Sequence, residues 1–161
     1  MMVKSILVPT DFSATSQTAL QYATQLALTL SARLYLVHVP GKTGEHLEAN
    51  FPVGEFETVA RNQLGSFLTP EDIARLQPEY ASRIGTPAEE IVRYAGARDV
   101  DLIVMGTHGR SGLAHAVMGS VAEQVVRSAP CPVLLVRFQK RAGGSQADAA
   151  AGVPVKTARG R

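Results

Sequence analysis

The stretch Asp101–Val126, DLIVMGTHGRSGLAHAVMGSVAEQVV, decides the fold of this chain. It opens with the apolar run Leu102–Met105, whose length and β-branched residues indicate a buried strand. Glycines follow at positions 106, 109, 112 and 119, and the apolar spacing after Gly119 predicts an amphipathic helix. Such a strand–glycine–helix sequence is how α/β proteins hold a phosphate, because glycine admits close backbone approach and helix starts present N–H groups. The alternative is a glycine-rich connection that binds nothing. Ser120 is expected in the first helical turn, where its hydroxyl either caps the helix or binds a phosphate oxygen.

The rest of the chain repeats the alternation of strand and helix. Strands are predicted at Val3–Val8, Arg33–Val39, Glu79–Ile84 and Val133–Val136. Helices are predicted at Ala14–Leu30, as two short helices within Glu55–Leu76, and from Thr86 to about Arg98. This order indicates an α/β fold with a doubly wound, five-stranded parallel sheet and helices on both faces.

Ligands of doubly wound sheets bind beyond the carboxyl ends of the strands, where the winding direction reverses. Three predicted strands end in segments that would meet there: Pro9-Thr10-Asp11, Val39-Pro40 and Met105-Gly106. Asp11 either serves the ligand or caps the following helix, and its place at a strand end favours the ligand. Arg110 either neutralises phosphate charge or is a solvated loop residue. His38, inside an apolar strand, is expected to be structural.

Composition limits the other functions. One domain is expected at 1–138, followed by a basic tail at 139–161 that has no amphipathic pattern and is expected to be disordered. Five of the 16 basic residues but one of the 14 acidic residues lie in that tail, so the basic balance does not indicate a nucleic-acid surface on the domain. The single cysteine fits a reducing compartment, and neither a signal peptide nor a membrane span is predicted. We therefore expect a cytoplasmic protein.

No catalytic or metal-ligating residue is predicted. Gly41-Lys42-Thr43 lacks the earlier glycine of a P-loop, because position 36 is leucine. His108 and His115 lie in the glycine-rich stretch, but no carboxylate of that loop is placed to orient either one as a general base. There is no Cys or His spacing typical of zinc sites.

Several segments carry a family pattern: ILVPTDFS at 6–13, LVHV at 36–39, DLIVMGTHGRSGL at 101–113, Gly119-Ser120 separated from Gly109 by nine residues, and APCPVLLV at 129–136. Together these segments resemble the universal stress protein family. The resemblance spans residues 3–137, and it implies a sheet of strand order 3-2-1-4-5. The chain departs from the family in the middle, where Pro70 interrupts what is usually one long helix.

The glycines of this chain match the ATP-binding subclass of that family. The resemblance implies that Pro9, Thr10 and Asp11 line the adenosine and that the Val39 backbone meets adenine. Met105 and Gly106 would close the ribose side. The remaining residues implied are those around the phosphates: Gly109, Arg110, Gly119, Ser120 and Val121. Mg²⁺ is expected with the nucleotide, held mainly by phosphate oxygens and water, because a lone Asp11 carboxylate would otherwise repel a triphosphate.

The last predicted strand, Val133–Val136, is an apolar edge that favours pairing with a second copy as a homodimer. The alternative is an edge covered by the tail. Together with this edge, the resemblance implies a nucleotide-responsive dimer in stress response as the expected function. Two other hypotheses are a slow ATPase or phosphotransfer enzyme using the same site, and a partner-binding module in which nucleotide is incidental.

Overall fold

The computed structural model describes residues 2–39, 58, 68–108 and 118–137. Within them, strands and helices alternate as the periodicity predicts. The elements are β1 (Ser5–Thr10), α1 (Ala14–Leu30), β2 (Arg33–His38), α3 (Pro70–Leu76), β3 (Glu79–Ser82), α4 (Pro87–Ala97), β4 (Leu102–Gly106), α5 (Ser120–Ser128) and β5 (Val133–Val136).

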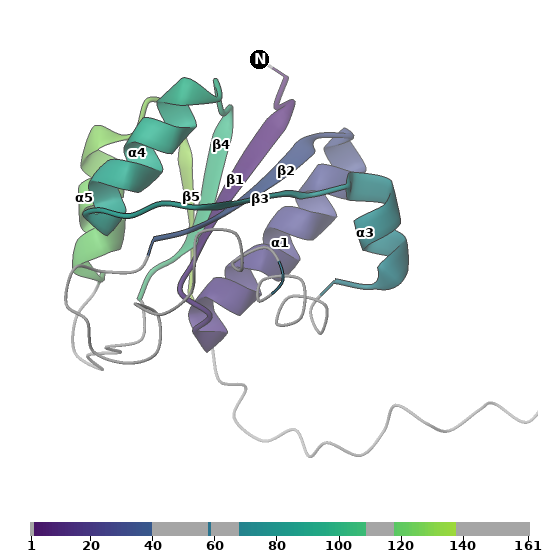
Figure 1. Ribbon diagram of the computed structural model, residues 1–161, viewed down its shortest axis with the longest axis horizontal. Coiled ribbons are helices and arrows are strands. Elements are labelled where there is room, and N and C mark those ends of the chain that lie inside the picture. The colour runs from purple at the N-terminus through teal and green to yellow at the C-terminus, as the bar shows by residue number, and fades with distance from the viewer. Residues whose placement is uncertain (1, 40–57, 59–67, 109–117, 138–161) are drawn as a thin grey trace, which may run out of the picture.

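The five strands form one parallel sheet in the order β3-β2-β1-β4-β5. Figure 1 shows α1 and α3 on one face of this sheet and α4 and α5 on the other. Both the doubly wound α/β fold and the strand order 3-2-1-4-5 are thus confirmed. Because all strands are parallel, their carboxyl ends meet at one edge, toward the lower left in Figure 1.

Two apolar clusters, one on each face, hold the sheet between its helices. Ile6 and Val8 of β1 pack with α1, whereas Leu7 between them packs with α4 and α5, and all three have 0% exposure. This alternation follows from the two-residue period of a strand, and burial on both faces explains why β1 reads as a continuous apolar run. Burying each such side chain contributes about 1.5–3 kcal/mol to folding.

The caps of α1 and α3 agree with the local sequence signals, whereas Thr86, the N-cap residue of α4, makes no side-chain cap hydrogen bond. Ser13 caps α1, because its side chain accepts a hydrogen bond from the Ser16 N–H at 3.2 Å. Thr69 and Asp72 form a reciprocal capping box at the start of α3, and Pro70 is the first helical residue.

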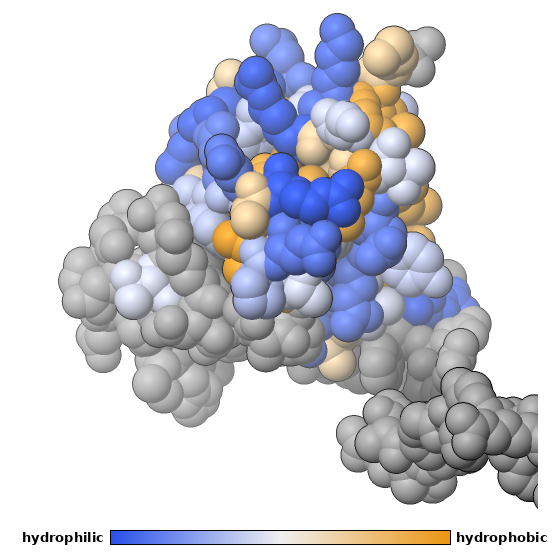
Figure 2. Space-filling view, turned by 90° about the vertical axis from the view of Figure 1, so that its right-hand side faces the viewer, coloured by the Kyte–Doolittle hydropathy of each residue, from blue (hydrophilic) through white to orange (hydrophobic). Residues whose placement is uncertain are grey.

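Figure 2 shows that the described residues on the side of the molecule bearing α3 are mainly hydrophilic.

Some expectations fall on residues that the structure does not describe. These are most of the first short helix predicted before Pro70, and the tail at 139–161. Both therefore stay predictions.

At the amino edge of the sheet, the carboxylate of Asp101 links two neighbouring strands. Asp101 precedes β4, and its Oδ2 accepts hydrogen bonds from the Lys4 N–H at 2.8 Å, the Ser5 N–H at 3.0 Å and the Ser5 hydroxyl at 3.0 Å. These donors, the Lys4 N–H first among them, hold the pKa of Asp101 below its usual value. Asp101 thereby joins the starts of β1 and β4.

Acid is expected to remove the stability that the Asp101 carboxylate contributes through these hydrogen bonds. Because folding lowers the pKa of Asp101, the contribution is fully present above the unfolded pKa of about 3.9 and is lost as pH falls through the folded pKa. The Asp101→Asn variant lacks this titration. Urea unfolding from pH 7 down to pH 2 should therefore show a steeper loss of stability for the parent than for Asp101→Asn. Parallel pH profiles would contradict this role.

Candidate functional site

The pairing between strands β1 and β4 ends before the carboxyl edge of the sheet. Their paired residues are Ile6 with Leu102 and Leu7 with Ile103, whereas pairing of β1 with β2 continues to Thr10 opposite His38. Pro9 lies in the part of β1 that pairs with β2 and is beyond the residues paired with β4, so its missing N–H costs no ladder bond to β4. The strand predicted at Val3–Val8 therefore covers Ser5–Thr10 instead: pairing with β2 carries it past the proline.

The turn from β1 into α1 is held by its own side chains. The Thr10 hydroxyl accepts a hydrogen bond from the Phe12 N–H at 3.1 Å, and Thr10 is 6% exposed. The half-buried Asp11 accepts the Ser13 N–H on Oδ1 at 3.0 Å. Since Ser13 provides the helix cap, Asp11 shapes the turn that precedes α1. Thr10 and Asp11 are thus fixed in place at the carboxyl edge.

At the end of β4, it is the backbone, and not the side chains, that lies at the carboxyl edge. The Met105 side chain is 5% exposed and belongs to the apolar cluster on the α4 and α5 face. A Cβ on Gly106 would lie 2.7 Å from Thr15 Cγ2 and 3.2 Å from the Thr15 carbonyl carbon. Gly106 therefore lets the first turn of α1 approach the end of β4, which brings the β1–α1 turn beside that strand.

Helix α5 begins at the same edge. The Gly119 N–H donates to the Thr107 carbonyl at 2.7 Å, and the Thr107 N–H donates to the Val136 carbonyl at 2.9 Å. Gly119 is the N-cap residue, and none of the described residues caps the helix with its side chain. Ser120 and Val121 occupy the first turn, so their N–H groups have no acceptor within the helix. The helix start can therefore donate hydrogen bonds to an anion and complement its charge.

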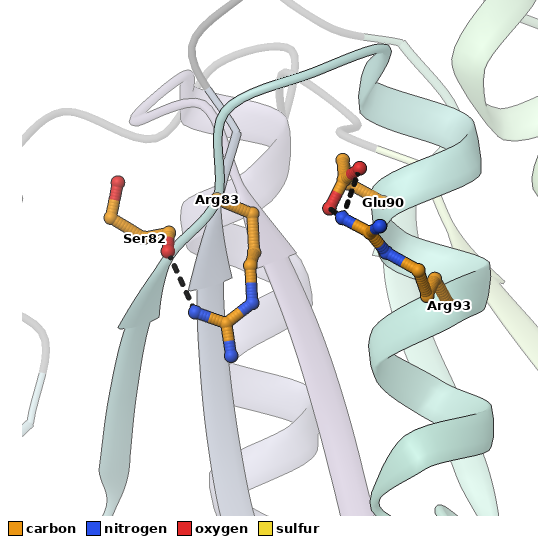
Figure 3. A network of polar contacts seen from close by, with 4 residues as sticks. All are labelled: Ser82, Arg83, Glu90 and Arg93. Carbon is orange, nitrogen blue, oxygen red and sulfur yellow. Dashed lines mark hydrogen bonds and ion pairs between the residues drawn. The ribbon is translucent and has the colours of Figure 1, made fainter.

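The β2 side of the edge is formed by Val39 and the turn between β3 and α4. Val39 is half-buried and packs against the cluster beneath α4. Figure 3 shows this turn, where Arg83 Nη1 donates to the Ser82 carbonyl at 2.9 Å, and the following helix α4, where Arg93 pairs with the buried Glu90. The Arg83 guanidinium also lies 5.1 Å from the centre of the Tyr94 ring.

The structure thus brings nine of the eleven predicted site residues to this carboxyl edge. The other two, Gly109 and Arg110, lie outside the described residues. Thr107 is a neighbour that sequence reasoning missed: its carbonyl joins β4 to α5, and its hydroxyl lies 3.0 Å from His108 Nδ1. No local pattern marks a carbonyl that accepts from a residue 12 positions later.

The described part of the chain contains no group of three or more His, Cys, Asp or Glu side chains that could hold a metal ion. None of its helices has the length and apolar character needed to span a membrane.

Comparison with known proteins gives consistent matches. The sequence model of the universal stress protein family matches residues 2–137. Universal stress protein MJ0531 of Methanocaldococcus jannaschii is 33% identical over 153 residues, covering 87% of this chain and 85% of that protein. The solved structure of MJ0577 from the same organism superposes with a TM-score of 0.65 at 31% identity, covering 87% of this chain and 99% of that one.

Two solved proteins of the same fold are nucleotide complexes. One is a universal stress protein in complex with cAMP, with a TM-score of 0.59 at 24% identity, covering 84% of this chain and 98% of that one. The other is the Archaeoglobus fulgidus protein in complex with dAMP, with a TM-score of 0.54 at 22% identity, covering 84% and 99%. The family match over nearly all of the described fold, with a relative above 30% identity, leads to one conclusion: this chain belongs to the universal stress protein family.

Proposed function

We propose that this protein binds ATP at the carboxyl edge of its sheet and acts as a nucleotide-responsive homodimer in stress response. The observation that carries the proposal is the start of α5, where Gly119 leaves the helix without a side-chain cap beside the end of β4. Anions bind at such a helix start because its N–H groups and its dipole both favour negative charge. The cAMP and dAMP complexes of family members with the same fold support an adenine nucleotide as the anion.

Each part of the nucleotide has residues that fit it. The phosphates would lie against the first turn of α5, at Gly119, Ser120 and Val121, with Gly109 and Arg110 completing their contacts. The ribose would lie against the backbone of Met105 and Gly106, whose side-chain space is filled by the core and by Thr15.

Adenine and adenosine contacts would come from the ends of β1 and β2, at Pro9 to Asp11 and at Val39. Because the Thr10 hydroxyl is committed to the turn, Thr10 would contact the ligand through its backbone. Mg²⁺ would accompany ATP, bound to phosphate oxygens and water. The chain's own residues bind and orient the nucleotide, and we assign none of them a catalytic role.

Gly119→Asp tests the phosphate contact with opposite effects on stability and on binding. An aspartate at the N-cap position stabilises a helix, by about 0.5–2 kcal/mol in typical cases. The same carboxylate repels a phosphate, and it occupies the N–H groups at the helix start that the phosphate would bind. Calorimetric titration with ATP and Mg²⁺ should show affinity weaker by roughly 100-fold, the size expected for juxtaposed like charges, while the melting temperature is kept or raised.

Gly119→Asn is the matched control, because it has the same shape and capping ability without the charge. It should weaken ATP binding less than Gly119→Asp does. Unchanged affinity in Gly119→Asp would remove the helix start from the site. Absence of saturable binding by the parent up to millimolar ATP would reject the nucleotide function and favour a partner-binding module.

The homodimer would form through β5. The Pro132 and Val136 carbonyls accept hydrogen bonds from Ile103 and Thr107, so the backbone of Val133 and Leu135 points away from β4. On this edge Leu134 is 38% exposed. An apolar edge strand with outward N–H and C=O groups favours pairing with a second copy about a two-fold axis.

A further inference from the structure

The last residue of β2 bonds the end of β1 through its side chain. His38 Nδ1 lies 2.7 Å from the Thr10 carbonyl oxygen, and His38 is 6% exposed. A carbonyl oxygen can only accept a hydrogen bond, so Nδ1 carries the proton and donates it. The geometry therefore defines which ring nitrogen is protonated.

This bond lies where β1 has already parted from β4. Thr10 pairs with His38 in the β1–β2 register, three residues beyond the last pair between β1 and β4. A buried carbonyl needs a donor, and the imidazole supplies one. The His38 carbonyl in turn accepts the Arg83 N–H at 3.0 Å, just after β3. One residue thus ties together the carboxyl ends of β1, β2 and β3, which lie side by side in Figure 1.

The same imidazole contacts the β1–α1 turn. The Phe12 ring centre lies 4.9 Å from that of His38, and the two rings are tilted by 46°. Phe12 has a φ of 62°, a left-handed conformation that bulky side chains rarely adopt and that persists only where surrounding contacts impose it. Besides His38, those contacts include the bond from the Phe12 N–H to Thr10 and the bond from Gln17 Nε2 to the Phe12 carbonyl at 3.2 Å.

We propose that His38 is a positioning residue of the nucleotide site. Its Nδ1–H group and its ring hold the segment Thr10–Phe12 in the conformation that binds adenosine, at the spacing from Val39 that the base requires. This inference rests on the nucleotide-binding function proposed above. It makes His38 act through Thr10 and Phe12, without touching the ligand itself.

Two variants of His38 separate the role of its Nδ1–H donor from the role of its ring. His38→Phe keeps an aromatic ring against Phe12 and removes the Nδ1–H donor to the Thr10 carbonyl. His38→Asn places an amide N–H near the position of Nδ1. We expect ATP affinity to fall by roughly ten- to 100-fold in His38→Phe, because loss of a buried hydrogen bond to the Thr10 carbonyl disfavours the binding conformation. In His38→Asn it should return to within a few-fold of the parent.

Val100→Ala is the control for general loss of stability. Val100 is 5% exposed and packs in the core just before β4, at the opposite edge of the sheet. Its variant should melt earlier yet bind ATP as the parent does. If His38→Phe binds as tightly as the parent, or no more weakly than Val100→Ala, the positioning role is overturned while nucleotide binding stands. If the parent itself fails to bind, the proposed function fails first and this inference with it.

A spectroscopic measurement tests the same bond in the parent protein, so it does not depend on whether a variant folds. Two-bond ¹H–¹⁵N correlation of the intact parent reports the protonation of each imidazole nitrogen. We expect Nδ1 of His38 to be protonated, both without nucleotide and with it. An unprotonated Nδ1 at neutral pH would exclude the bond to Thr10 and overturn the inference.

Discussion

Gly106→Val is expected to lower the free energy of unfolding by about 3 kcal/mol, the upper part of the range for overpacked cores. Even a single Cβ on this residue would lie 2.7 Å from Thr15 Cγ2 and 3.2 Å from the Thr15 backbone. Valine adds two methyl groups at the same contact, so the first turn of α1 must move away from β4. Because the Thr10–Asp11 turn leads directly into α1, ATP affinity should fall as well. Urea unfolding and calorimetric titration measure the two effects.

A double-mutant cycle locates the cause of that loss. Thr15→Ser removes the methyl group that lies nearest the introduced Cβ and keeps the hydroxyl. Combined with the milder Gly106→Ala, it should restore part of the lost stability, with a coupling of about 0.5–3 kcal/mol for residues in contact. Strictly additive effects of the two substitutions would show that the close approach of Gly106 to Thr15 does not determine this position.

Leu135→Pro is expected to convert the proposed homodimer into a monomer, raising its dissociation constant by roughly 100-fold or more relative to Leu135→Ala. Proline removes the Leu135 N–H, which points away from β4, so the ladder inside the sheet is kept while the outer edge loses a donor. Proline is tolerated on edge strands for this reason. Sedimentation equilibrium across a protein dilution series measures the change.

Leu135→Ala is the matched control for this substitution. It removes the same packing against the core but leaves the N–H in place. Its dissociation constant should therefore stay near that of the parent. A parent that is monomeric at micromolar concentration would reject the dimer through β5, and equal dimerisation by the proline and alanine variants would place the contact elsewhere.

Local patterns of the sequence were sufficient for the elements and the family. The bounds of α1 and β5 agree with the periodicity at Ala14–Leu30 and Val133–Val136, because each element's own spacing and caps define where it starts and ends. The glycines after Met105 and the segment from Ile6 to Ser13 were enough to indicate the universal stress protein family, and the family match confirms it. The strand order 3-2-1-4-5 then followed from the resemblance.

Contacts between distant residues were decided by the tertiary structure alone. The extension of β1 through Pro9 depends on where β4 diverges, and no feature of residues 3–10 reports that. The sequence interpretation of His38 as structural was correct about its burial, but it did not reveal the bond to Thr10, 28 residues earlier. Gly106 was assigned to the ribose, and the structure adds that Thr15 occupies its side-chain space. The physical reason is common to all three: periodicity and capping act over one or two turns, whereas a hydrogen-bond partner or a steric neighbour across the sheet exists only once the strands have assembled.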